Sequence, residues 1–214
     1  MLALYLHRVL SSITREDRGL ISRSQIGVAT KLGVVDSGYA TRRTCNSDAV
    51  MQLKPITPAG IPAALQKAER YRLLNESYAA ESICLDVLAI DPGNQEALVS
   101  LLLSITDQFI EEMADGVLRA RDVLPRLSDE YERVYYAGII CERRARAQLH
   151  RGSLGSADVA SEWFRDAMTW YEKAEKMRPP GNDEAILRWN TCVRMLERHE
   201  RVHSHREYEP VLED

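Results

Sequence analysis

The stretch Tyr78-Ala-Ala-Glu-Ser-Ile-Cys-Leu-Asp-Val-Leu-Ala-Ile-Asp-Pro92 decides the fold of this chain, because its spacing occurs again in Ala167-Met-Thr-Trp-Tyr-Glu-Lys-Ala-Glu-Lys-Met-Arg-Pro179. In both stretches a small residue stands twelve positions before a proline, a small or apolar residue five before it, and a large apolar residue two before it. Proline lacks a backbone N–H and disfavours helical geometry in the preceding residue, so it ends a helix. The small residues then mark where each helix presses closely against a neighbour.

This spacing resembles that of the tetratricopeptide repeat (TPR), a helix–turn–helix unit of about 34 residues. The second stretch keeps the aromatic of the repeat at Tyr171. The first departs from it at Cys84, where a large aromatic is usual, and at Ala64, where the first helix often carries tryptophan. The resemblance covers about residues 58–200. It implies an all-α fold, a TPR-like α-solenoid of antiparallel helix pairs in three irregular repeats with a C-terminal capping helix.

Apolar periodicity predicts where the helices lie. They are expected at about residues 62–74, 78–90, 95–109, 112–124, 129–149, 159–177 and 183–196. Asn94, Ser128 and either Asn182 or Asp183 are the expected N-caps of the third, fifth and seventh helices. The loop 151–156 should separate the fifth helix from the sixth and make the third repeat longer than the others.

Composition and charge divide the chain into parts. With 214 residues, 45% of them hydrophobic, it can bury a core. Residues 1–50 lack periodicity and predict a poorly ordered leader, or a segment upstream of a true start at Met51. Residues 58–200 form the expected helical domain, and 201–214 a polar tail. Residues 1–50 hold seven Lys/Arg and four Asp/Glu, against 21 and 28 in the remainder. The acidic remainder argues against nucleic-acid binding.

The cysteines and the hydropathy favour a cytoplasmic protein without cofactors. Cys45, Cys84, Cys141 and Cys192 are far apart and form no C-x-x-C pair. We interpret them as small buried hydrophobes in a reducing compartment. No apolar run approaches the ~20 residues that a membrane-spanning helix needs, so no membrane association is expected.

One motif suggests an enzyme. His199-Glu200-Arg201-Val202-His203 fits the H-E-x-x-H signature of zinc peptidases, in which two imidazoles on one helix face bind the metal and the glutamate activates water. Such enzymes need apolar flanks and a third protein ligand further on, whereas Arg198 precedes the motif here. We interpret it as a solvated helix end; incidental metal binding, with His205, Glu207 or Glu209, and catalysis are the alternatives.

Three further groups of residues have a structural and a functional interpretation. The acidic residues Asp107, Glu111, Glu112 and Asp115 are expected on a solvated helix face, with a cation site as the alternative. The basic residues Arg143, Arg144 and Arg146 form a solvent-facing strip, with partner binding as the alternative. The indoles of Trp163, Trp170 and Trp189 would pack between copies if the chain self-associates.

The resemblance also implies a concave groove lined by the first helices of the pairs. The groove positions carried over from the family are Glu69, Arg72, Val99, Leu103, Thr106, Tyr135, Arg143, Asn190 and Arg194, with Ile139, Glu142 and Arg146 as further positions of the third pair. Family members that grip the C-terminal carboxylate of chaperones place Lys and Asn along the first helix. Leu65 and Glu69 stand there instead, which disfavours that partner class.

The sequence therefore predicts a non-enzymatic scaffold or adaptor that binds a protein or peptide in its groove. A zinc peptidase or metal-binding activity at His199–His203, and a self-association module, are the alternative functions.

Overall fold

The computed structural model describes residues 52–153 and 155–207, the last eight of them by backbone alone. Contacts divide the chain into two units, Met1–Val50 and Met51–Asp214, and all the described residues belong to the second. The predictions for the leader, for a start at Met51 and for Cys45 fall outside the described residues.

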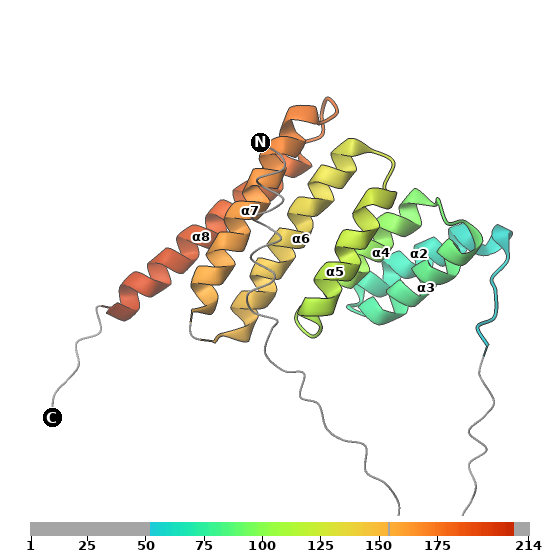
Figure 1. Cartoon of the computed structure of the whole chain (residues 1–214), viewed down its shortest axis with the longest axis horizontal. Coiled ribbons are helices and arrows are strands. Elements are labelled where there is room, and N and C mark those ends of the chain that lie inside the picture. The colour runs from blue at the N-terminus through green and yellow to red at the C-terminus, as the bar shows by residue number, and fades with distance from the viewer. Residues whose placement is uncertain (1–51, 154, 208–214) are drawn as a thin grey trace, which may run out of the picture. The chain divides into compact units, whose positions relative to one another are not determined.

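The described residues are helical and contain no β-strand, which confirms the all-α prediction (Figure 1). In these two ranges the helices are α2 (Ile61–Leu73), α3 (Ser77–Ile90), α4 (Gln95–Asp107), α5 (Met113–Val123), α6 (Glu130–Arg151), α7 (Ser156–Met177) and α8 (Glu184–Glu207), with short 3-10 turns η1 (Pro58–Gly60) and η2 (Leu124–Arg126).

Local chemistry explains the first helix ends. Asn75 adopts a φ of 61° between α2 and α3, a left-handed conformation that asparagine tolerates better than most residues. Helix α3 ends at Ile90, two residues before Pro92. The Asn94 side chain accepts a hydrogen bond of 2.9 Å from the Ala97 N–H at the start of α4, as predicted for an N-cap.

Two helix starts differ from the prediction. Helix α6 is capped by Asp129 rather than Ser128, because the Asp129 carboxylate accepts from the Tyr131 N–H at 2.9 Å. The Ser128 N–H donates instead to Gln95 Oε1 at the start of α4. Helix α7 begins at Ser156, earlier than expected, because Gly155 reverses the chain with a φ of 77°.

The last helix begins where expected and is longer than expected. Asn182 Oδ1 accepts from the Glu184 N–H at 3.0 Å, so Asn182 caps α8. The helix then continues past residue 201, the start of the predicted tail, to Glu207.

Each helix packs against the next one in the sequence, and α4 also contacts both α2 and α6. The buried apolar side chains form two clusters. One lies among α2 to α5 and includes Ile140 and Ala147 of α6, and the other lies among α6, α7 and α8. Helix α6 is therefore buried on two faces.

Helices α6 and α7 approach closely at Gly138. A Cβ atom at this position would lie 2.5 Å from Cε1 of the Tyr171 ring. Tyr171 is fully buried, and its hydroxyl donates a 2.7 Å hydrogen bond to the carboxylate of Glu142, which is also fully buried. Arg146 and Arg188 pair with the same carboxylate at 2.7 and 3.4 Å.

Cys84, Cys141 and Cys192 are buried free thiols, which confirms the interpretation of these three as core residues. Across the described ranges, every helix is too short or too polar to cross a lipid bilayer.

Candidate partner-binding groove

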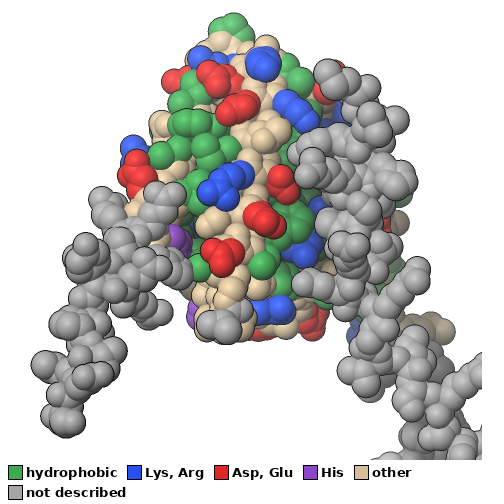
Figure 2. All heavy atoms as spheres, turned by 60° about the vertical axis from the view of Figure 1, so that its left-hand side comes forward, with side chains coloured by type: hydrophobic (Ala, Val, Ile, Leu, Met, Phe, Trp, Pro, Cys, Tyr) green, Lys and Arg blue, Asp and Glu red, His purple; other side chains and the backbone are tan. Residues whose placement is uncertain are grey.

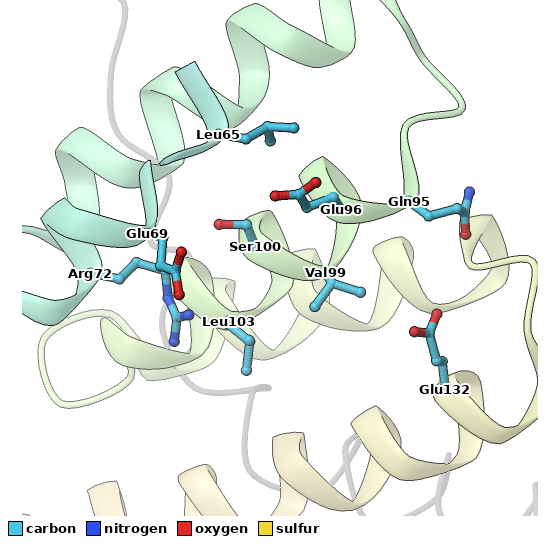
Figure 3. A pocket seen from close by; sticks show the side chains of 9 residues that line it. All are labelled: Leu65, Glu69, Arg72, Gln95, Glu96, Val99, Ser100, Leu103 and Glu132. Atoms are coloured by element: carbon cyan, nitrogen blue, oxygen red, sulfur yellow. The ribbon is translucent and has the colours of Figure 1, made fainter. Parts of the chain in front are cut away.

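A groove of about 450 Å³ opens on the side of the molecule where α2, α4 and α6 face solvent (Figure 3). It takes residues from these three helices, which are the first helices of the predicted pairs. They are Leu65, Glu69 and Arg72 from α2, Gln95, Glu96, Val99, Ser100 and Leu103 from α4, and Glu132 from α6.

Three apolar side chains line the groove. Leu65 is 6% exposed, whereas Val99 and Leu103 are half-buried and keep apolar surface open to solvent. Val99 and Leu103 are one helical turn apart on α4, and thus lie on one face of that helix. We call Leu65, Val99 and Leu103 the apolar floor.

Three carboxylates line the groove beside this floor, one from each helix. Glu69 and Glu96 are exposed and Glu132 is half-buried. Among the described residues, none of the three has an ion-pair or hydrogen-bond partner. We call Glu69, Glu96 and Glu132 the acidic rim.

The arginines of the groove are already paired. Arg72 Nε donates to Asp107 Oδ2 at 3.0 Å, and Arg143 of α6 binds the other oxygen of the same carboxylate. Asp107 belongs to α4, so one carboxylate joins α2, α4 and α6. Beside this ion bridge the groove continues into a second hollow of about 430 Å³ that shares Glu69 and Arg72 with the first.

The charge of the rim is not balanced locally. Burial raises the pKa of the Glu132 carboxyl, and repulsion from Asp129 and Glu184 raises it further. A cation placed beside Glu132 would relieve this repulsion. The groove therefore offers apolar contact and unpaired negative charge within one surface.

The structure brings together five of the predicted groove residues. Glu69, Arg72, Val99 and Leu103 line the first hollow, and Arg143 lines the second. Both predicted positions of α2 and two of the three of α4 therefore line the first hollow.

Four predicted positions face the interior instead. Ile139 is 1% exposed and belongs to the cluster among α6, α7 and α8. Thr106 is 2% exposed and its hydroxyl donates to the Leu103 carbonyl, because α4 is buried around most of its circumference. Tyr135 is 8% exposed and packs against Tyr171. Glu142 is turned toward α7 and α8 and has no exposed surface.

The two predicted positions of α8 lie apart from both hollows. Asn190 is half-buried and Arg194 is exposed, but neither lines either hollow of the groove. Figure 2 turns the side where α7 and α8 lie toward the viewer. On its coloured atoms, acidic and basic side chains are interspersed among hydrophobic ones, without a patch of one sign.

Sequence reasoning missed part of the acidic rim. Glu96 lies one turn before Val99 and Ser100 on α4, so helical spacing from the predicted Val99 was a signal that pointed to it. Glu132 had no such signal, because the rotation of α6 about its axis depends on how its two buried faces pack.

The three arginines of the predicted basic strip on α6 contact three different partners. Arg143 pairs with Asp107, Arg146 pairs with Glu142, and the Arg144 guanidinium lies 4.0 Å from the centroid of the Trp163 ring. The other two indoles also have partners in the chain. Lys173 Nζ lies 4.2 Å from the Trp170 ring centroid, and Trp189 Nε1 donates to Glu172 at 3.1 Å.

The H-E-x-x-H motif lies on α8, and the side chains from residue 200 onward fall outside the described residues. In the described part of the chain, including the predicted acidic face, no three His, Cys, Asp or Glu residues are arranged to hold a metal ion.

Comparison with known proteins adds no relative: no family model, curated protein or solved structure matches the chain.

Proposed function

We propose that this protein is a tetratricopeptide-like α-solenoid that binds a segment of another protein in the groove between α2, α4 and α6. It acts as a scaffold or adaptor and catalyses no reaction. The observation that carries this proposal is the groove itself, which takes residues from three successive first helices and in which Val99 and Leu103 keep apolar surface open to solvent.

The packing order supports the repeat architecture. Contacts between consecutive helices, together with those of α4 with α2 and α6, are the pattern that stacked helix pairs produce. The ion bridge at Asp107 keeps α2, α4 and α6 in register beside the groove. A groove formed on packed helices is held ready before a partner arrives, which lowers the entropy cost of binding.

Peptide selection on the full-length chain tests the proposal. A phage library of random 12-residue peptides is selected on the immobilised protein, and recovered peptides are measured by fluorescence anisotropy. Val99→Ala and Leu103→Ala each remove part of the floor and should weaken binding at least about fivefold, as expected for an anchor position.

Leu187→Ala is the matched control, because Leu187 is 63% exposed on α8 and lies outside the groove. This variant should bind with unchanged affinity, and circular dichroism establishes that all three variants are folded. A library without enrichment, or binding that is insensitive to both floor variants, would show that the groove is not a binding site.

A further inference from the structure

We propose that the groove selects a basic segment: a stretch of polypeptide that places an apolar side chain on the apolar floor and lysine or arginine side chains against the acidic rim. This inference rests on the proposed function, and it adds the chemistry of the partner.

The charges that are free after folding support this choice. Both arginines near the groove are held by Asp107, whereas the three rim carboxylates have no ion-pair or hydrogen-bond partner in the described part of the chain. The first hollow carries three carboxylates and one guanidinium group, a formal charge of −2, whereas the second carries two of each and is formally neutral. The surface that a ligand meets over the apolar floor is thus negative. An acidic or phosphorylated ligand would be repelled there, and a cationic one would be attracted.

The position of the acidic rim supports the choice of a basic segment independently. Its three carboxylates come from three helices, and Figure 3 shows Glu96 between Leu65 and Val99 with Glu69 and Glu132 on either side. One ligand segment can therefore contact floor and rim together. The mutual repulsion around Glu132, Asp129 and Glu184 is a cost that a ligand cation removes on binding.

The extent of the groove favours a polypeptide over a small cation. The two hollows adjoin at Glu69 and Arg72, and each holds more than 400 Å³. A single ammonium ion would leave the floor uncovered. A peptide with an apolar anchor and flanking lysines can cover the apolar floor and also place positive charge beside the acidic rim, because lysine carries its charge at the end of a flexible apolar stem.

The same peptide selection distinguishes this inference from the proposed function. Wild-type protein should enrich peptides that are net positive and contain an apolar anchor. The full-length variant Glu69→Lys/Glu96→Lys/Glu132→Lys should lose that preference or select acidic peptides. Enrichment of neutral or acidic peptides that still need Val99 and Leu103 would overturn the basic-segment inference and leave the groove intact as a site. A failed enrichment would overturn both.

Single substitutions measure how much each carboxylate of the acidic rim contributes to peptide affinity. With the best selected peptide, Glu69→Gln, Glu96→Gln and Glu132→Gln should each weaken binding about two- to fivefold, as for ion pairs at a solvated surface. Glu175→Gln, on the exposed surface of α7 and outside the groove, is the matched control and should change nothing. The effects should shrink in high salt, since salt screens exposed charges. Rim variants indistinguishable from the control would refute the assigned role.

A second copy of the chain is the competing occupant. Sedimentation over a range of concentrations tests it on the full-length protein. A mass that stays monomeric supports a foreign segment, whereas a dimer that the triple rim variant dissociates would overturn the proposal by placing another copy in the groove.

Discussion

Substituting Gly138 by alanine should destabilise the protein, although the same change in an exposed helix is stabilising. The added Cβ would lie 2.5 Å from Cε1 and 2.8 Å from Cδ1 of Tyr171, and these contacts are far below van der Waals distance. The ring must retreat by roughly 1 Å to restore ordinary carbon–carbon contact. It has no free direction, since Tyr171 is fully buried and its hydroxyl is bonded to Glu142.

The size of the change in the free energy of unfolding follows from two opposing effects. Overfilling a packed core costs about 1–3 kcal/mol, and a displaced ring also weakens the hydrogen bond to Glu142, which contributes about 1 kcal/mol. Alanine regains about 1 kcal/mol of helix propensity over glycine. We therefore expect Gly138→Ala to lower the free energy of unfolding by about 1–3 kcal/mol.

Gly116→Ala in α5 is the matched comparison. Its Cβ would lie 3.1 Å from the Phe109 ring, so a much smaller adjustment restores normal contact. The propensity gain should offset that cost, and the variant should remain within about 0.5 kcal/mol of wild type.

Urea unfolding followed by circular dichroism at 222 nm measures both changes. A double-mutant cycle with Tyr171→Leu then isolates the contact, because the alanine at position 138 should cost little once the ring is gone. A Gly138→Ala protein as stable as wild type, or a cycle without coupling, would refute the close approach of α6 and α7.

Three further predictions follow from the described contacts. Asp129→Ala should lower the free energy of unfolding by about 1 kcal/mol while Ser128→Ala has little effect, and equal losses in urea unfolding would contradict the cap assignment. Glu142→Leu should cost about 2–3 kcal/mol in the same assay, because it leaves a buried tyrosine hydroxyl without its acceptor; a near-neutral result would contradict the network. Burial raises the pKa of the Cys141 and Cys192 thiols from 9.0 to about 12, so the folded chain keeps protons that the unfolded chain has lost, and stability should fall as the pH rises from 9 toward 12. Replacing both cysteines by alanine should flatten the dependence of the urea midpoint on pH over this range, and an unchanged slope would be evidence against the thiols.

Local chemistry made the helix order predictable. Pro92 and Pro179 end helices because a proline beyond the first turn cannot continue a helix. Asn94 caps α4 through a hydrogen bond to a residue three positions on. The start of α7 was less predictable, since it depends on a left-handed Gly155 in a loop whose sequence contains several residues able to begin a helix.

The groove was predictable where a helix has one buried face and unpredictable where it has two. On α2 the residues Leu65, Glu69 and Arg72 follow helical spacing, and only one side of that helix meets the core. Helix α6 packs against both hydrophobic clusters, so its apolar pattern fits several rotations about the helix axis. For this reason the sequence placed Tyr135 in the groove, whereas the fold places Glu132 there.

The net charge of the groove depends on which arginines form ion pairs within the fold, and amino-acid composition does not reveal this. Arg143, Arg144 and Arg146 are near neighbours in sequence, yet α-helical rotation of about 100° per residue directs them to different partners. One neutralises Asp107 beside the groove, one covers the Trp163 ring, and one pairs with buried Glu142. Because these arginines are held in place by the fold, the groove keeps the negative charge of its glutamates, and a basic ligand would bind there without displacing an existing ion pair.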